Sequence, residues 1–355
     1  MSARGRRWLA RGAMVLAGTL LAGALAEGYV RARGLGWRTV NRSLYWQGSD
    51  LEVYRYSDDP FLHYELNPGA RTEGTGPWGN RFTISVDEYG ARGPVHASSA
   101  STETFRILVL GGSTIFGAGV DDSETIPAVL ERLLADPGAL GAAERRYEAW
   151  NFGNSGYVAA QAIRLARNSL AALDRVDLIV IVPTNNGRRP FLGGPDAMER
   201  DHRWFFWHDP SAYLENFPPP ARVPAGIHRG LLRHSELYRY VIARRRLQMP
   251  NNPAGQAHIA AINLAEVRAL WAEADSLDTK VVFAYYPRRG RAAPPNMGFV
   301  VPLGGFVDLQ RADQPDAFYE VHPPPGYLAQ HAATLAEELL AAGYLPSAPS
   351  PGATP

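Results

Sequence analysis

"ILVLGGSTIFGAGV", residues Ile107 to Val120, joins an apolar run to a loop that contains four glycines and Ser113. The apolar run begins at Phe105, and its continuity is typical of a parallel strand that is buried on both faces. The loop does not match a phosphate-binding loop, because Ala118 stands where G-x-x-x-x-G-K-[ST] requires lysine. Its glycines also do not fit the dinucleotide spacing G-x-G-x-x-G. The stretch therefore indicates either a tight turn or a strand-end loop that presents Ser113 as a nucleophile.

The bulk composition limits the class of protein. The chain has 355 residues, of which 46% are hydrophobic, and its net charge is +1. This length favours one main domain of about 200–250 residues with additions. The near-neutral charge argues against a nucleic-acid partner. The chain contains no cysteine, which excludes disulfides, thiolate metal sites and a cysteine nucleophile. We expect no cofactor and no bound metal.

The N-terminus has the pattern of an export signal. Arginines precede the apolar run Ala13–Ala26, at positions Arg4, Arg6, Arg7 and Arg11. Two interpretations remain open: a signal peptide that is cleaved near Ala26, or an uncleaved membrane anchor formed by residues 13–30. Both interpretations export the rest of the chain to a periplasmic or other extracytoplasmic location and leave the arginines inside.

The rest of the chain divides by composition. Residues 27–100 are polar and punctuated by glycine and proline, which indicates extended segments, turns and a linker. Residues 101–345 carry an α/β pattern, and residues 188–258 interrupt it, which we interpret as an insertion or lid. Residues 346–355 are rich in proline and predict a disordered tail.

Strands and helices alternate through the α/β segment. Further strands are expected at Tyr147–Gly153, Asp177–Val182 and Lys280–Tyr286, with helices after a cap at Asp122 or Ser123, at Ala159–Leu173 and at Gly326–Gly343. This alternation predicts a parallel sheet with helices on both faces. In such sheets the functional loops lie beyond the carboxyl ends of the strands.

Four of these loops carry residues that suit acyl transfer. Ser113 could be the nucleophile, and His322, before the last helix, could be its base. The N–H of Gly156, just ahead of a helix, and the side-chain amide of Asn185 could stabilise an oxyanion. The sequence thus supplies a nucleophile, a base and oxyanion donors on separate loops at one edge of one sheet.

This constellation resembles the SGNH/GDSL hydrolase family. The blocks "GGST", "NFGNSG", "PTNN" and "YEVH" occur in the order of that family, between about Phe105 and Leu340. The resemblance implies a flavodoxin-like three-layer α/β/α sandwich with serine esterase or acyltransferase activity. It also implies that Ser113 is the nucleophile, that Ser113, Gly156 and Asn185 form the oxyanion hole, and that His322 is the base. The segments "HYELNPGAR" and "ISVDEYGARG" resemble the leader of membrane-tethered bacterial members.

The last block departs from the family pattern. The acid of the family stands three residues before the histidine, where this chain has Tyr319. Three alternatives could orient His322: Glu320, which an extended segment points to the same side; Asp316, six residues earlier; or a backbone carbonyl. Departures outside the triad, which leave Asn185 in place, occur at Gly112, Pro183 and Asn186.

The expected function is therefore that of an exported serine hydrolase that cleaves or transfers acyl groups at ester bonds. Location and resemblance together suggest acylated carbohydrate of the cell envelope, such as its O-acetyl groups, as the substrate. The absence of the family's acid at Tyr319 motivates an alternative from another class. In that alternative the chain is a non-catalytic carbohydrate-binding protein of the envelope, built on a degenerate hydrolase fold.

Overall fold

The computed structural model divides the chain into two compact units. One contains Met1–Tyr45 and Pro190–Asn252, and the other contains Trp46–Arg189 and Pro253–Pro355. The structure describes residues 3–35, 53–59, 61–62, 64–96, 101, 103–136, 140, 142–183, 220, 222–248, 253–285, 305–309, 315, 320 and 322–347. Much of the expected insertion, the expected tail from residue 348 and part of the expected linker lie outside these residues.

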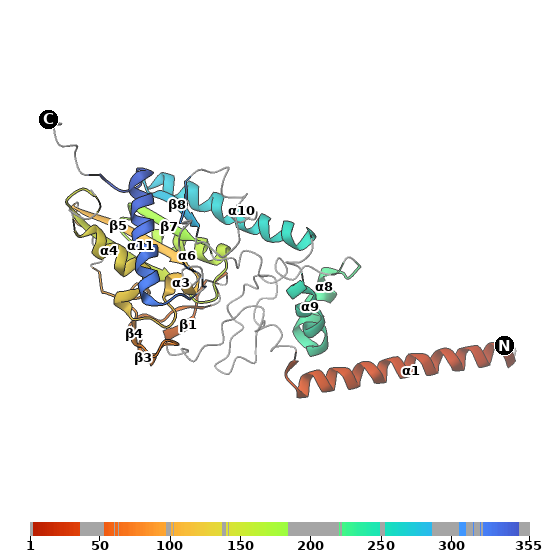
Figure 1. Cartoon of the computed structure of the whole chain (residues 1–355). Coiled ribbons are helices and arrows are strands. Elements are labelled where there is room, and N and C mark those ends of the chain that lie inside the picture. Colours follow the sequence, from red (N-terminus) through yellow and green to blue (C-terminus); the bar gives the residue numbers. More distant parts are fainter. Residues whose placement is uncertain are drawn as a thin grey trace. The chain divides into compact units, whose positions relative to one another are not determined.

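The larger unit is built on a five-stranded parallel sheet (Figure 1). From one edge to the other, the strands are β6 (Arg146–Gly153), β5 (Thr104–Gly111), β7 (Leu178–Val182), β8 (Lys280–Tyr285) and β9 (Phe306–Asp308). The first strand in the chain is thus the second in the sheet, which is the flavodoxin-like order. All eight residues of β5 are buried, as its apolar run Ile107–Leu110 predicts. The buried residues include Arg106, which pairs with Glu148.

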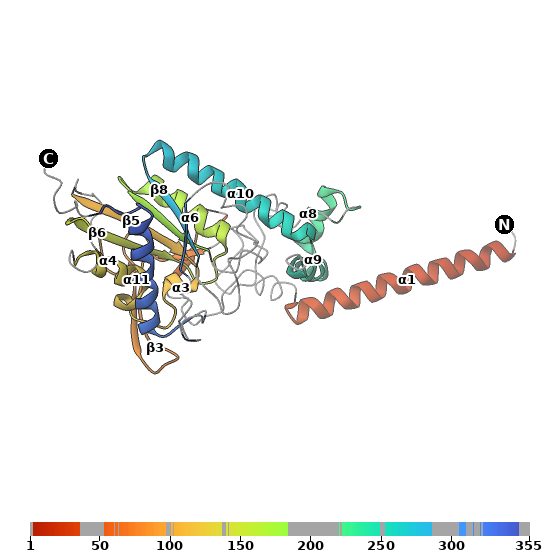
Figure 2. The ribbon, with the colours of Figure 1, turned by 45° about the horizontal axis from the view of Figure 1, so that its top comes forward.

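Helices cover both faces of this sheet (Figures 1 and 2). The helices α4 (Ile126–Leu134) and α11 (Pro325–Ala341) pack together on one face, and α6 (Ala159–Ala172) and α10 (Pro253–Ser276) pack together on the other. Ile107 of β5 and Leu335 of α11 share the core on the first side. Trp271 of α10 stacks on Phe283 of β8 on the second side, with ring centroids 5.5 Å apart. The predicted three-layer α/β/α sandwich is confirmed.

The helix α4 begins later than the sequence predicts. Asp121, and not Asp122 or Ser123, is the first capping residue, and it caps the short 3₁₀ turn η2 (Asp122–Glu124). The side chain of Thr125 then caps α4 by accepting a hydrogen bond from the Ala128 N–H at 3.4 Å. Residues Asp122–Glu124 therefore form a separate turn, because Asp121 caps this turn and Thr125 caps the helix that follows it.

Two small antiparallel ladders precede the sheet in the same unit. The strand β1 (Tyr54–Tyr56) pairs with β2 (Tyr64–Leu66), and β3 (Arg71–Thr75) pairs with β4 (Arg81–Ser85). Their buried residues form a small apolar cluster with Phe116, which follows β5, and its members are Val53, Leu66, Ile84, Val86 and Phe116. The N-terminal strands therefore pack on the turn that contains Ser113.

The smaller unit consists of three helices among the described residues. These are α1 (Ala3–Ala32), α8 (Ala225–His234) and α9 (Glu236–Gln248), and α1 contacts α9. Residues Gly5–Ala32 of α1 are long and apolar enough to cross a membrane. The helix runs without a break through Ala26, the expected cleavage position.

Candidate active site

The strand order places a switch point at the carboxyl ends of β5 and β7. The chain leaves β5 through α4 on one face of the sheet, and it enters β7 through α6 on the opposite face. In open α/β sheets, ligand sites are typical of a place where the connections diverge in this way. Ser113 stands two residues after β5, and Pro183 directly follows β7.

A single helical turn presents Ser113. The helix α3 (Ser113–Phe116) begins directly after Gly112 and ends at Gly117, which has a left-handed backbone with φ of 83°. The Gly117 N–H donates to the Ser113 carbonyl at 3.0 Å and closes the turn. The other three residues of α3 are buried, whereas Ser113 is half-buried. Three side chains of the turn therefore pack in the core, and Ser113 remains partly accessible at the edge of the sheet.

Two glycines allow α3 to lie close to the strand ends. A Cβ on Gly111 would lie 2.7 Å from the Val182 carbonyl oxygen, and a Cβ on Gly153 would lie 2.2 Å from the main-chain nitrogen of Phe116. Real Cβ contacts are not this short. Close approach of backbone to backbone thus explains Gly153 in β6 and Gly111, one of the four glycines in the loop that does not match a phosphate-binding pattern.

His322 meets Ser113 across the sheet edge. Its Nε2 atom lies 2.7 Å from the Ser113 Oγ atom, although the two residues are 209 positions apart. His322 is exposed and stands three residues before α11. A separation of 2.6–3.2 Å is the hydrogen-bonding range of a serine nucleophile and its base. The geometry therefore suits transfer of the Ser113 proton to the imidazole.

Gly156 lies in the loop after β6, at the same edge. The Asn154 N–H donates to the Gly111 carbonyl at 3.0 Å, so this loop begins beside the end of β5. Gly156 has a positive φ of 83°, a conformation that favours glycine. The loop therefore turns sharply beside α3 before α6 begins.

Hydrogen bonds with residues in and beside β2 hold this loop. The Tyr64 hydroxyl donates to the Ser155 carbonyl at 2.5 Å, and the Tyr157 hydroxyl donates to the Tyr64 carbonyl. The side-chain amide of Gln161 adds a third hydrogen bond, which it donates to the Leu62 carbonyl at 2.9 Å. Burial raises the pKa of Tyr157 well above its usual value, so its hydroxyl keeps the proton that it donates. These bonds fix the residues on both sides of Gly156.

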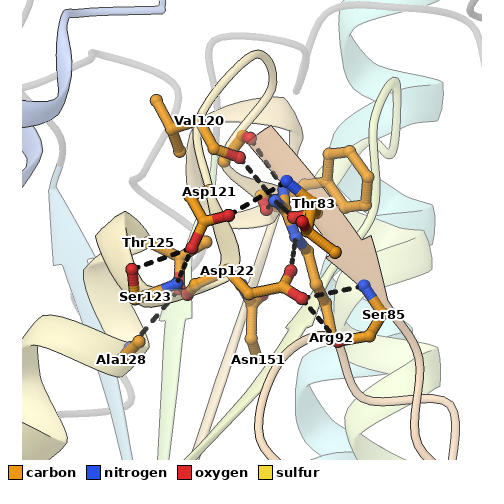
Figure 3. Close-up of polar contacts among 12 residues, drawn as sticks. Thr83, Ser85, Arg92, Val120, Asp121, Asp122, Ser123, Thr125, Ala128 and Asn151 are labelled. Atoms are coloured by element: carbon orange, nitrogen blue, oxygen red, sulfur yellow. Dashed lines mark hydrogen bonds and ion pairs between the residues drawn. The ribbon is translucent and has the colours of Figure 1, made fainter. Parts of the chain in front are cut away.

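Arg92 holds the segment that follows Ser113 (Figure 3). Its side chain is fully buried, and four of its N–H groups donate to main-chain carbonyls. The distances are 2.6 Å to Phe116, 2.7 Å to Gly117, 2.6 Å to Val120 and 3.1 Å to Thr83. The guanidinium also lies over the ring of Phe116, 4.8 Å from its centroid. One side chain thus fixes the path of the chain on the C-terminal side of the nucleophile.

Asp122 balances the charge of Arg92. The Arg92 Nε donates to Asp122 Oδ1 at 2.7 Å, which uses the fifth N–H of the guanidinium. The main-chain N–H and the hydroxyl of Ser85 donate to the other carboxylate oxygen. Burial lowers the pKa of Arg92, and the adjacent carboxylate opposes this shift. The sequence analysis did not predict this pair. Arg92 lies in the segment "ISVDEYGARG", which was interpreted only as similar to the leader of membrane-tethered proteins.

Comparison with protein-family models finds no match to this chain, and comparison with curated proteins finds none. Among solved structures, the chain is similar to one described as a lipolytic protein of the G-D-S-L family from Desulfitobacterium hafniense. The two chains are 12% identical, and the TM-score is 0.36. The match covers 66% of this chain and 99% of the other. It is also similar to TesA, with 16% identity, a TM-score of 0.35 and coverage of 66% and 97%. An acetyl xylan esterase, Est2A from Butyrivibrio proteoclasticus, has 11% identity and a TM-score of 0.33 over 75% and 68%.

The chain has a flavodoxin-like α/β/α fold with the sheet order β6-β5-β7-β8-β9. On this fold the structure brings Ser113, His322 and the Gly156 loop to one edge of the sheet. Asn185, of the block "PTNN", lies outside the described residues, two positions after Pro183. Of the residues that could orient His322, Glu320 is exposed and stands two positions before it, whereas Asp316 lies outside the described residues. The roles of Asn185, Glu320 and Asp316 stay predictions.

Proposed function

We propose that this protein is an exported serine hydrolase that cleaves or transfers acyl groups at ester bonds. The observation that carries the proposal is the distance of 2.7 Å between His322 Nε2 and Ser113 Oγ. A histidine and a serine at this separation on an exposed sheet edge form a nucleophile–base pair. The rigid support of both neighbouring loops, by Arg92 on one side and Tyr64 on the other, favours catalysis because a preorganised site needs little rearrangement.

The proposed reaction proceeds in two steps through an acyl-enzyme. His322 accepts the Ser113 proton while Ser113 Oγ attacks the ester carbonyl, and the oxyanion accepts hydrogen bonds from the N–H groups of Ser113 and Gly156 and from the Asn185 amide. The ester bond then breaks, and the alcohol leaves with the proton from His322. Water, or a sugar hydroxyl in a transfer reaction, then attacks the acyl-serine carbonyl and gives its proton to His322. The bond between the acyl group and Ser113 Oγ breaks, His322 returns the proton to Oγ, and the acid or the new ester leaves.

A group on the far side of the imidazole orients the base. Glu320 is the candidate that we favour, because residues two apart in an extended segment point to the same side. Asp316 is the second candidate, and a backbone carbonyl is the third. In serine proteases, changing the orienting acid lowers kcat by about 10⁴-fold, so this choice determines how active the enzyme is.

The proposed location is the outer side of a membrane. A helix of 28 residues, Gly5–Ala32, is long enough to anchor the chain, and the leading arginines favour retention of the N-terminus inside. A hydrolase held there meets the polysaccharides of the cell envelope. We therefore propose acylated carbohydrate, with O-acetyl groups as the simplest case, as the substrate class.

A substrate screen tests this function. Purified wild type and Ser113→Ala are assayed with short-chain aryl esters and with acetylated sugars, with and without an added sugar acceptor. We expect the variant to lose hydrolysis by more than about 10⁴-fold. Acyl transfer to the acceptor identifies a transferase. Equal rates in wild type and variant, together with binding of acetylated polysaccharide by both, would instead support the non-catalytic binding protein.

A further inference from the structure

One carboxylate joins the last turns of α1 to α9. Glu27 accepts a hydrogen bond from the Ser235 hydroxyl at 2.7 Å and bonds from the main-chain N–H groups of Glu236 and Leu237 at 2.9 Å each. These two N–H groups belong to the first turn of α9, where a helix supplies no internal acceptor. Glu27 therefore caps α9, and its negative charge lies at the positive end of the helix dipole.

Arg31 ties the same end of α1 to α8. Its Nη2 donates to Glu27 at 2.8 Å and to the main-chain oxygen of His234, the last residue of α8, at 3.0 Å. Val30, between these two residues, is buried, whereas residues 6–25 of α1 are exposed. The boundary between the part of α1 that is exposed on all sides and the part that packs on one face therefore lies at Ala26 and Glu27.

We expect the surface of the bilayer to lie at this boundary. Large apolar side chains cover the exposed part of α1 and include Trp8, Leu9, Met14, Val15, Leu16, Leu20, Leu21 and Leu25. Apolar residues on all sides are typical of a helix that crosses a membrane. The ion pair of Glu27 and Arg31 belongs outside the hydrocarbon, because charge inside it is costly. The α8–α9 pair is thus attached where α1 leaves the bilayer.

The α8–α9 pair is basic and carries exposed apolar side chains. Residues 222–248 contain seven arginines and one acidic residue, Glu236. Glu236 pairs with the buried Arg239 at 2.8 Å. The remaining arginines include Arg244 and Arg245, which are exposed.

Three apolar side chains of this pair are exposed as well. Ile227 and Leu231 lie one turn apart on α8 and are 57% and 37% exposed, and Val241 on α9 is 43% exposed. Side chains four positions apart share one face of a helix. Basic helices with exposed apolar residues bind the surface of membranes that contain anionic lipids.

We propose that α8 and α9 form a second membrane contact, which lies on the surface of an anionic phospholipid bilayer beside the exit of α1. The apolar side chains of Ile227, Leu231 and Val241 enter the headgroup region, and the arginines bind lipid phosphates. This inference rests on the proposed membrane location of α1 and not on ester hydrolysis. The cap at Glu27 makes the contact specific, because it fixes α9 to α1 at the level of the bilayer surface.

The absence of cysteine from the chain permits a direct test. Full-length Ile227→Cys carries a single nitroxide label and is reconstituted in nanodiscs of phosphatidylcholine with or without phosphatidylglycerol. Val95→Cys is the matched control, because Val95 is an apolar residue of the larger unit that is 77% exposed. We expect the label at position 227 to be several-fold more accessible to oxygen, relative to a water-soluble nickel complex, than the label at position 95, and only with anionic lipid.

A charge variant tests the role of the arginines. Each basic residue near an anionic surface changes the ratio of bound to free helix by about fivefold. Replacing Arg244 and Arg245 by glutamine in the labelled Ile227→Cys chain should therefore lower that ratio by about 25-fold and return the label to water. The control is the double replacement of Arg71 and Arg81, exposed arginines of the larger unit, by glutamine.

Two outcomes would overturn the proposal. In the first, the label at position 227 is as accessible to water in anionic nanodiscs as the label at position 95. In the second, lipid composition has no effect but a soluble anionic polysaccharide shields the label, which assigns the basic surface to carbohydrate. Incorporation into nanodiscs and ester hydrolysis are measured on the same samples, so failure of this inference is distinct from failure of the proposed function.

Discussion

Arg92 donates a hydrogen bond of 2.6 Å to the main-chain carbonyl of Phe116, so a residue that follows the N-terminal strands holds the turn that presents Ser113. The same side chain bonds the carbonyls of Gly117 and Val120. Its acceptors are main-chain atoms, apart from the carboxylate of Asp122. Arg92 therefore fixes the backbone path of the nucleophile loop, and Ser113 depends on it for position.

We expect Arg92→Lys to lower both stability and catalysis. Lysine keeps the charge but has three donors and no planar fork, so at least two charge-assisted hydrogen bonds are lost. At about 1.5–3 kcal/mol each, their loss should lower the free energy of unfolding by about 3 kcal/mol or more. Urea unfolding measures this change. The kcat for an aryl ester, measured where the variant remains folded, should also fall because Ser113 is misplaced.

Arg106→Lys is the matched control for that variant. Arg106 is also fully buried, but it lies in β5 near the strand end opposite Ser113, where it pairs with Glu148 at 3.2 Å and Asp174 at 3.0 Å. Its replacement should destabilise the protein to a similar degree while the folded fraction keeps the kcat of wild type. An equal loss of kcat in both variants would show that Arg92 acts only through global stability.

Gly153→Ala tests the close approach of β6 to the nucleophile turn. The new methyl group would lie 2.2 Å from the Phe116 nitrogen, so α3 must move. We expect overpacking to cost about 1–3 kcal/mol of unfolding free energy, and kcat to fall because Ser113 moves with α3. Gly230→Ala is the control, since no atom lies within 4 Å of its added Cβ. A Gly153→Ala variant that keeps the kcat of wild type would contradict this account.

Asp121 makes a contribution to stability that depends on pH. Burial acts to raise its pKa, but hydrogen bonds from Ser123 and the Thr83 N–H outweigh burial and lower it. A carboxyl whose pKa is lower in the folded state stabilises the fold above its unfolded pKa of about 3.9, and this stability is lost as the pH falls through the folded pKa.

The variant Asp121→Asn removes this charge and keeps the shape of the side chain. Because Asp121 is half-exposed, we expect a loss of only about 0.3–1 kcal/mol at pH 7. Urea unfolding of both proteins from pH 7 to pH 3 checks the sign: the difference should shrink as the pH falls below about 4. A difference that stays constant across this range would show that the charge of Asp121 has no part in it.

Glu320→Gln and Asp316→Asn together identify the group that orients His322. If Glu320 has this role, its replacement should lower kcat by up to about 10⁴-fold with little change in KM. Asp316→Asn should then be close to wild type. The reverse pattern assigns the role to Asp316, and two variants with the kcat of wild type would point to a Ser113–His322 dyad held by a backbone carbonyl.

The frame of the fold could be predicted because its signals are local. The apolar run Ile107–Leu110 marked β5, and the alternation of strand-like and helix-like segments marked β6, β7, β8 and α11 to within a few residues. The strand β9 was missed, since its three residues, Phe306–Asp308, are too few to show a pattern. The start of α4 was misplaced because the side chains of Asp121, Asp122, Ser123 and Thr125 are all of types that cap helices, and the sequence does not rank them.

The support of the site could not be predicted, because it depends on contacts between distant segments. Arg92 and Tyr64 bond main-chain carbonyls 24 and 91 residues away, and main-chain acceptors leave no trace in the sequence. The contacts of Glu27 with α9 span more than 200 residues. By contrast, Ser113 and His322 could be found, since each stands in a recognisable block at a strand or helix end.

Covalent labelling with a fluorophosphonate tests the central claim most directly. The reagent reacts with a serine that an adjacent base activates, and intact-mass and peptide analysis locate the adduct. The account predicts one adduct on Ser113 of the wild type, none in Ser113→Ala, and much slower labelling in His322→Ala. A folded wild-type protein that remains unlabelled at Ser113, or that reacts at the same rate without His322, would contradict it.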